Sequence, residues 1–140
     1  MTNKDKKKWL LEYRKLDQDI ERDMEELQRL KSRAEKITSS VSGMPKGGNQ
    51  GDRLQLAVDR ICELEERLNG KIDAAVKRRK EMEAAITTVE DKTLQLILRY
   101  KYIDDMHWDE IAEKIHYSFR HTTKLHGKAL TQIKMPHNAP

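Results

Sequence analysis

Apolar residues recur at alternating steps of three and four along the first part of the chain. The repeat is interrupted by Asp23, which takes a position that calls for an apolar side chain and has Met24 beside it. Such spacing places one apolar stripe on a helix that packs against another helix. We therefore expect a long helix whose seam is weakened at Asp23 or has its register marked there. The apolar positions are Tyr13, Leu16, Ile20, Leu27, Leu30, Ala34 and Ile37.

A polar segment separates this repeat from a second one. The glycines, serines and proline of residues 39–52 cannot continue the pattern, so we predict a loop there, with Asp52 as the N-cap of the next helix. In the second stripe two steps of four fall together, from Leu64 to Leu68 and from Leu68 to Ile72, close to Gly70. An insertion of this kind unwinds a coiled coil locally, and a bend or a local change of partner is expected. The stripe is Ala57, Ile61, Leu64, Leu68, Ile72, Ala75, Arg79, Met82, Ile86 and Val89.

Residues 1–89 are therefore expected to form an oligomerisation region. Two helices of similar length can fold back as an antiparallel hairpin, and one narrow stripe on each leaves apolar surface for another chain. We expect a homo-oligomer, built on an intrachain hairpin or on a helix pair exchanged between subunits. The cationic run at 77–80 could touch DNA backbone, but a solvated helix face is favoured for it.

The spacing of apolar positions in residues 90–135 predicts a small all-helical domain with a tight turn at residues 116–118. Three short helices around such a turn are typical of a helix-turn-helix domain. Ser118 is the expected N-cap of the third helix, and residues 136–140 are expected to be a flexible tail. The apolar positions are Leu94, Ile97 and Leu98 in the first helix, Trp108, Ile111, Ala112 and Ile115 in the second, and Thr122, Leu125, Ala129, Leu130 and Ile133 in the third. The predicted fold class of the chain is all-α.

The outward face of the third helix carries the candidate chemistry. Groups near the start of a recognition helix reach base edges in the major groove, and Arg120 and Lys124, four residues apart, can each donate to guanine O6 and N7. Phe119 either rests on a thymine methyl group or closes the core of the domain. The candidates for phosphate contacts, which position the protein without reading sequence, are His107, Tyr117, His121 and Lys128.

The charge distribution agrees with this assignment. The net charge is only +4, and charged residues make up 37% of the chain against 36% hydrophobic residues, which argues against one large closed core. From Lys114 to Lys134, however, the chain carries five cations and no acid. A local basic strip on an otherwise balanced chain indicates an anionic partner, and we expect double-stranded DNA.

The string LILRYKYIDDMHWDEIAEKIHYSFRHTTKLHGKAL resembles region 4 of bacterial sigma factors, particularly the short extracytoplasmic-function form. The shared elements are LRY (98–100), the W-x-E-I-A core (108–112), the turn at Ser118 and the closing KAL (128–130). The resemblance implies that the helix after the turn reads DNA in the major groove through Phe119, Arg120, Thr123 and Lys124. Three departures are His116 where a turn glycine is usual, Gly127 inside the helix, and Arg120 in place of an acid.

The chain as a whole is similar to another group of regulators. No aromatic residue lies between Arg14 and Arg99, so the exposed aromatics of a promoter-melting domain are missing. A coiled coil followed by a sigma region 4-like domain is similar to the phage and prophage late-gene transcriptional regulators of Gram-positive bacteria, the ArpU and RinA type. That resemblance implies activation of packaging, structural or lysis genes. Whether RNA polymerase is contacted stays open.

Two other classes compete with the regulator. A small terminase-like DNA recognition subunit for phage packaging also joins a helix-turn-helix to a coiled coil, and a purely structural protein would carry the basic strip as a solvated face. An enzyme is not expected, because no phosphate-binding glycine loop, HExxH or nucleophile elbow occurs. No metal or cofactor is expected. The chain lacks an apolar run long enough for a membrane span, and a cytoplasmic location is expected.

Overall fold

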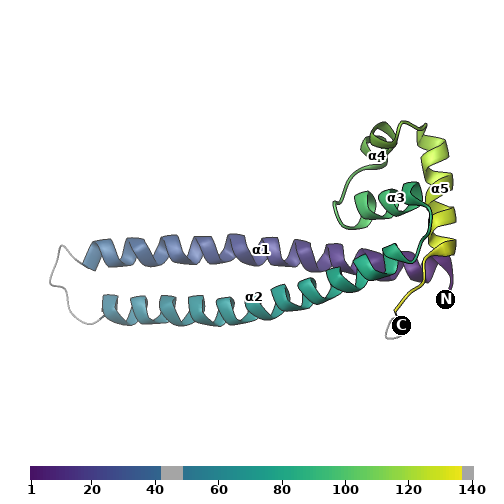
Figure 1. The fold of residues 1–140 in the computed structure, drawn as a ribbon. Coiled ribbons are helices and arrows are strands. Elements are labelled where there is room, and N and C mark those ends of the chain that lie inside the picture. The colour runs from purple at the N-terminus through teal and green to yellow at the C-terminus, as the bar shows by residue number, and fades with distance from the viewer. Residues whose placement is uncertain (42–48, 137–140) are drawn as a thin grey trace. The chain divides into compact units, whose positions relative to one another are not determined.

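A computed structural model describes residues 1–41 and 49–136, and this part of the chain is helical without a strand (Figure 1). The prediction of an all-α fold is confirmed. The helices are α1 (Asn3–Val41), α2 (Asn49–Thr87), α3 (Lys92–Tyr102), α4 (Trp108–Ile115) and α5 (Phe119–Gln132). They belong to two compact units. The central unit comprises residues 18–74, and the terminal unit comprises residues 1–17 together with the chain from residue 75 onward.

The segment between α1 and α2 is shorter than the predicted loop. Residues 39–41 and 49–52 are helical, and residues 42–48 lie outside the described residues. Asp52 lies within the first turn of α2, so its prediction as the N-cap is wrong. A carboxylate in the first turn is still favourable there because it faces the positive end of the helix dipole. Ser39, Ser40 and Gly51 fit in helix because their cost is at most about 1 kcal/mol each.

In the central unit α1 and α2 lie side by side and run in opposite directions (Figure 1). The buried apolar side chains are Ile20, Leu30, Leu64 and Leu68. Asp23 lies among them with only 8% of its surface exposed. Lys71 Nζ donates a hydrogen bond to Asp23 Oδ2 at 2.8 Å, and this bond, the largest contribution, lowers the pKa of Asp23.

This ion pair fixes the register of the two helices. Lys71 Nζ also lies 3.6 Å from Asp19 Oδ2, and Arg67 Nε lies 3.7 Å from Asp23 Oδ2. A shift by one turn that places Ala75 where Lys71 lies would leave the carboxylate of Asp23 without Lys71 and beside apolar side chains, which is costly. Of the two roles expected for Asp23, the structure therefore favours marking the register.

The seam of α2 near Gly70 differs from the predicted stripe. The seam passes through Lys71, whereas Ile72 is 37% exposed and Arg79 is exposed. With Lys71 and Arg78 in place of Ile72 and Arg79, the steps along α2 alternate between four and three from Leu64 to Met82. α2 accordingly continues as α-helix through Gly70, where an added Cβ would meet nothing within 4 Å.

The terminal unit has one core to which both long helices contribute. Trp9 and Leu10 of α1 and Met82 and Ile86 of α2 are buried in the same cluster as α3 and α5 side chains. The other buried members are Ala85, Val89, Leu94, Leu98, Tyr102, Ala129, Leu130 and Ile133. The three short helices therefore share their core with residues outside 90–135. This grouping differs from the expected domain boundary at residue 90. Of the expected tail at 136–140, residues 137–140 lie outside the described residues.

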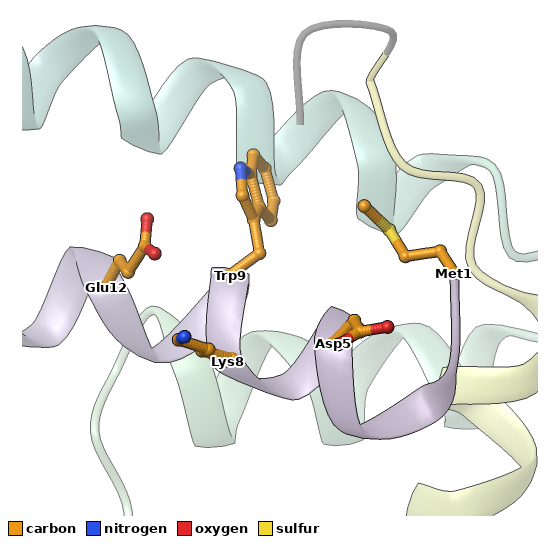
Figure 2. Close-up of a pocket in the computed structure, with 5 residues that line it drawn as sticks. All are labelled: Met1, Asp5, Lys8, Trp9 and Glu12. Carbon is orange, nitrogen blue, oxygen red and sulfur yellow. The ribbon is translucent and has the colours of Figure 1, made fainter. Parts of the chain in front are cut away.

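Trp9 is the central aromatic of the α1–α2 packing in this unit. Its indole points away from α1 toward the neighbouring helix, and the side chain of Met1 lies on the same side of α1 (Figure 2). The guanidinium of Arg78 lies 4.8 Å from the centroid of the Trp9 ring, and Arg78 Nη1 lies 3.2 Å from Glu12 Oε2. Arg78 therefore makes a cation–π contact with Trp9 and an ion pair with Glu12.

The start of α1 also caps the end of α5. Lys6 Nζ donates to the carbonyl oxygens of Leu130, Thr131 and Ile133 at 2.8, 3.3 and 3.0 Å. The last carbonyls of a helix lack partners within the helix, and a cation is favourable at the negative end of its dipole. Lys6 thereby fixes the end of α5, whose other end carries the candidate site.

Candidate nucleic-acid interface

The chain reverses between α4 and α5 at a left-handed residue. His116 has φ 62° and ψ 39°, and its backbone N–H donates to the carbonyls of Ala112 and Glu113. Tyr117 N donates to Ala112 O at 3.1 Å. A left-handed residue after the last helical turn ends a helix in this way. Histidine takes that conformation more readily than most non-glycine residues, so the turn forms without the usual glycine.

Ser118 begins α5 as predicted. Its Oγ accepts a hydrogen bond from His121 N at 3.1 Å, which confirms the N-cap. Its carbonyl oxygen accepts a further bond from Thr122 Oγ1 at 2.8 Å. A helix N-terminus needs such acceptors because its first N–H groups have no partner in the helix. The direction of α5 is therefore set by the turn and the cap together.

The two faces of α5 differ as the spacing predicted. Thr122, His126, Ala129 and Leu130 are buried, and α5 packs against α3 and α4. The opposite face exposes the candidate cations Arg120, Lys124 and Lys128, together with His121. Three of the five cations of the basic strip therefore share an exposed side of α5, opposite its buried apolar side.

The aromatic candidates near the turn are also exposed. Phe119 is 52% exposed, so it does not close the core, and Tyr117 is 46% exposed. The rings of Tyr117 and His121 meet edge to face with centroids 4.8 Å apart. This contact holds His121 against the turn at the start of the cationic face.

The two remaining candidates have different surroundings. Thr123 is half-buried, and its hydroxyl donates to Arg120 O at 2.9 Å, so it is engaged within its own helix. His107 is exposed at the N-cap of α4, where its side chain makes no capping hydrogen bond. His107 lies at the start of α4, apart from the other candidates in the sequence. Those are Tyr117 in the turn and six residues of α5: Phe119, Arg120, His121, Thr123, Lys124 and Lys128.

Sequence reasoning missed His126, which joins the three short helices. It is 8% exposed, its Nε2 lies 2.6 Å from Tyr102 Oη, and its ring meets that of Trp108 edge to face with centroids 4.6 Å apart. Burial, followed by the charges of Lys7 and Lys101, lowers the pKa of His126 to about 4. The ring is therefore neutral near pH 7 and shares a hydrogen bond with the Tyr102 hydroxyl, whose own pKa is raised by burial.

A signal for His126 was present in the sequence. It follows Thr122 by four residues and precedes Ala129 by three, which places it on the inward stripe of α5. The three histidines spaced five residues apart thus have separate roles. His116 makes the turn, His121 is exposed beside it, and His126 is part of the core.

Residues 1–41 and 49–136 contain no group of three or more His, Cys, Asp or Glu side chains placed to hold a metal ion. Cys62 is exposed on α2. None of the helices in the described ranges combines the length and the apolar character that a membrane span requires.

A protein-family model covers most of the region described above. It is the model described as "Protein of unknown function (DUF1492)", and it matches residues 36–133, more than half of the 140 residues. The chain belongs to this family. The DUF1492 match takes in α2, α3, α4 and α5, so the turn at His116 and the cationic face lie inside it. Neither a curated protein nor a solved structure matches the chain.

Proposed function

We propose that this protein is a sequence-specific, double-stranded DNA-binding transcriptional regulator. In this proposal α4, the turn at His116 and α5 form a helix-turn-helix, and α5 enters the major groove. The observation that carries the proposal is the exposed, acid-free cationic face at the N-terminal end of α5, opposite a buried apolar face. That amphipathic division is what a recognition helix requires.

The dimensions of α5 suit the groove. Its 14 residues span about 21 Å, and the major groove is roughly 12 Å wide, which accepts one helix. Arg120 and Lys124 are separated by about 6 Å along the helix axis. They can therefore donate to the edges of neighbouring base pairs, with Phe119 available for a thymine methyl group.

The remaining candidates are assigned to the DNA backbone. Lys128 lies four residues beyond Lys124 on the exposed side of α5, and Tyr117 and His121 lie together at the turn. Contacts of this kind to phosphates set the orientation of the recognition helix without reading sequence. In this arrangement Thr123 contributes its methyl group, because its hydroxyl already donates to Arg120 O.

We assign the long helices to oligomerisation and spacing. The paired helices of the central unit expose a charged surface over a narrow apolar seam, as in a coiled-coil hairpin. A homo-oligomer would present two or more copies of α5 to adjacent sites on DNA. Together with the resemblance to sigma region 4 and to phage late-gene regulators, this favours an activator that binds upstream of a promoter.

Selection of bound fragments from random duplex DNA by the purified full-length protein tests the proposal. We expect a recovered consensus with two half-sites related by the symmetry of the oligomer. Light scattering on the same preparation gives the number of subunits. Recovery of no preferred sequence would contradict the regulator, and a closed ring of eight or more subunits would favour a terminase-like packaging subunit instead.

A further inference from the structure

A groove between α1 and α2 in the central unit combines apolar and cationic side chains. Leu30 is buried and Ala57 half-buried in its lining, and Leu56 stands beside them with 63% of its surface exposed. The groove is also lined by three arginines, which we call the arginine triad: Arg33, Arg53 and Arg60. Leu56 thus offers exposed apolar surface beside these cations, which a ligand in the groove could cover.

The arginine triad differs from the other arginines of the same two helices. Arg29 pairs with Glu26 at 2.6 Å, and Arg67 lies 3.7 Å from Asp23. Within residues 1–41 and 49–136, by contrast, no carboxylate forms an ion pair with a member of the triad, and all three side chains are exposed. The groove therefore presents three guanidinium groups whose hydrogen-bond donors are available to a ligand.

The positions of the triad define the spacing of its ligand. Arg53 and Arg60 are seven residues apart on α2, which is two turns or about 10 Å. The Asp23–Lys71 pair fixes the antiparallel register of the helices. In this register Arg33 lies ten residues from Asp23, level with the turn of α2 that contains Arg60. Arg33 and Arg60 thus form one cationic position and Arg53 forms a second, about two turns away. Leu56 lies between these two positions in the sequence of α2.

We propose that this groove binds an acidic amphipathic helix of a partner protein. Carboxylates two turns apart on that helix would pair with the arginines in the bidentate geometry that guanidinium groups favour. An apolar side chain between them would pack on Leu56 and remove it from water. Residues 18–74 contain no aromatic side chain on which an unstacked base could lie, so the surface is less suited to single-stranded nucleic acid.

A designed peptide tests this proposal on the full-length protein. The probe is a fluorescein-labelled helix of about 20 residues, long enough to be helical, with leucines along one stripe and glutamates seven residues apart beside it. We expect the wild-type protein to bind it at least about tenfold more tightly than the matched peptide with glutamines. The double variant R53E/R60E should lose this binding.

The matched control is K77E/K80E, which makes the same charge change on the same helix outside the groove. It should bind the acidic peptide as the wild type does, with an unchanged circular dichroism spectrum in both variants. Equal affinity for the glutamate and glutamine peptides, or unchanged binding by R53E/R60E, would overturn the proposal. Loss of duplex DNA binding by R53E/R60E without any peptide binding would assign the groove to nucleic acid and would also overturn it.

The outcome is separable from that of the DNA-binding proposal. The peptide measurement on the full-length protein contains no DNA, and the proposed peptide-binding residues all belong to the central unit. R120E/K124E should therefore retain peptide binding whatever its effect on DNA, and its loss of peptide binding would contradict the assignment to this groove.

Discussion

Replacement of both Arg120 and Lys124 by glutamate is expected to lower the affinity for the selected duplex at least about 25-fold. Each bidentate contact to guanine contributes roughly 1–3 kcal/mol of discrimination, so losing two costs about 2–6 kcal/mol, and each 1.4 kcal/mol is a factor of ten. The introduced carboxylates also repel nearby phosphates. Both side chains are exposed on α5, so the fold should not change. Fluorescence anisotropy at one fixed salt concentration measures the loss.

The control for this experiment is a second double charge reversal on the same protein. Lys77 and Lys80 of α2 are exposed cations that we assign to a solvated face, and K77E/K80E changes the net charge equally. We expect less than about a threefold change in affinity from it, since it removes no direct contact. Equal losses in the two variants would show that overall charge, and not the face of α5, determines binding.

Acidification from pH 7 to about pH 4 is expected to lower the free energy of unfolding by about 2–3 kcal/mol through His126 alone. The folded-state pKa of about 4 lies below the ordinary value of 6.5, so the unfolded chain binds a proton in this interval that the folded chain does not. The stabilisation is therefore present above pH 6.5 and is lost as the pH falls toward 4. Urea unfolding at a series of pH values measures it.

The variant His126→Gln isolates this effect. Glutamine does not titrate and can still accept a hydrogen bond from the Tyr102 hydroxyl, so its stability should be nearly constant between pH 6.5 and 4. Because the pKa of Asp23 is also lowered in the folded protein, a separate loss of stability follows as the pH falls below 3.8, the ordinary pKa of an aspartate. If wild type and variant lost stability in parallel between pH 6.5 and 4, His126 would not be the group responsible.

The local features of the terminal unit could be predicted from the sequence. The N-cap at Ser118, the left-handed residue at His116 and the inward stripe of α5 depend on neighbours within about four residues. The exposure of Arg120 and Lys124 follows from that stripe, since a helix that buries one side exposes the other. Whether the exposed side binds DNA is a separate question of chemistry, which the proposed experiments address.

Features that depend on distant partners could not be predicted in the same way. The choice between Lys71 and Ile72 for the seam of α2 requires knowledge that Asp23 lies opposite, 48 residues away. The contribution of Trp9 and Leu10 to the core of α3 and α5 also depends on contacts between segments far apart in the chain. In both cases a tertiary contact decides between assignments that local periodicity leaves nearly equal.

The most direct test of the central claim is a base-analogue scan of the selected duplex with the wild-type protein. Replacing single guanines or adenines by their 7-deaza analogues removes the N7 acceptor from the major groove and leaves the minor groove unchanged. If α5 lies in the major groove, substitution at the half-site centres should lower affinity at least about tenfold, and R120E/K124E should show no such sensitivity. Unchanged affinity at every 7-deaza position, with losses only for 3-deazaadenine in the minor groove, would contradict the account.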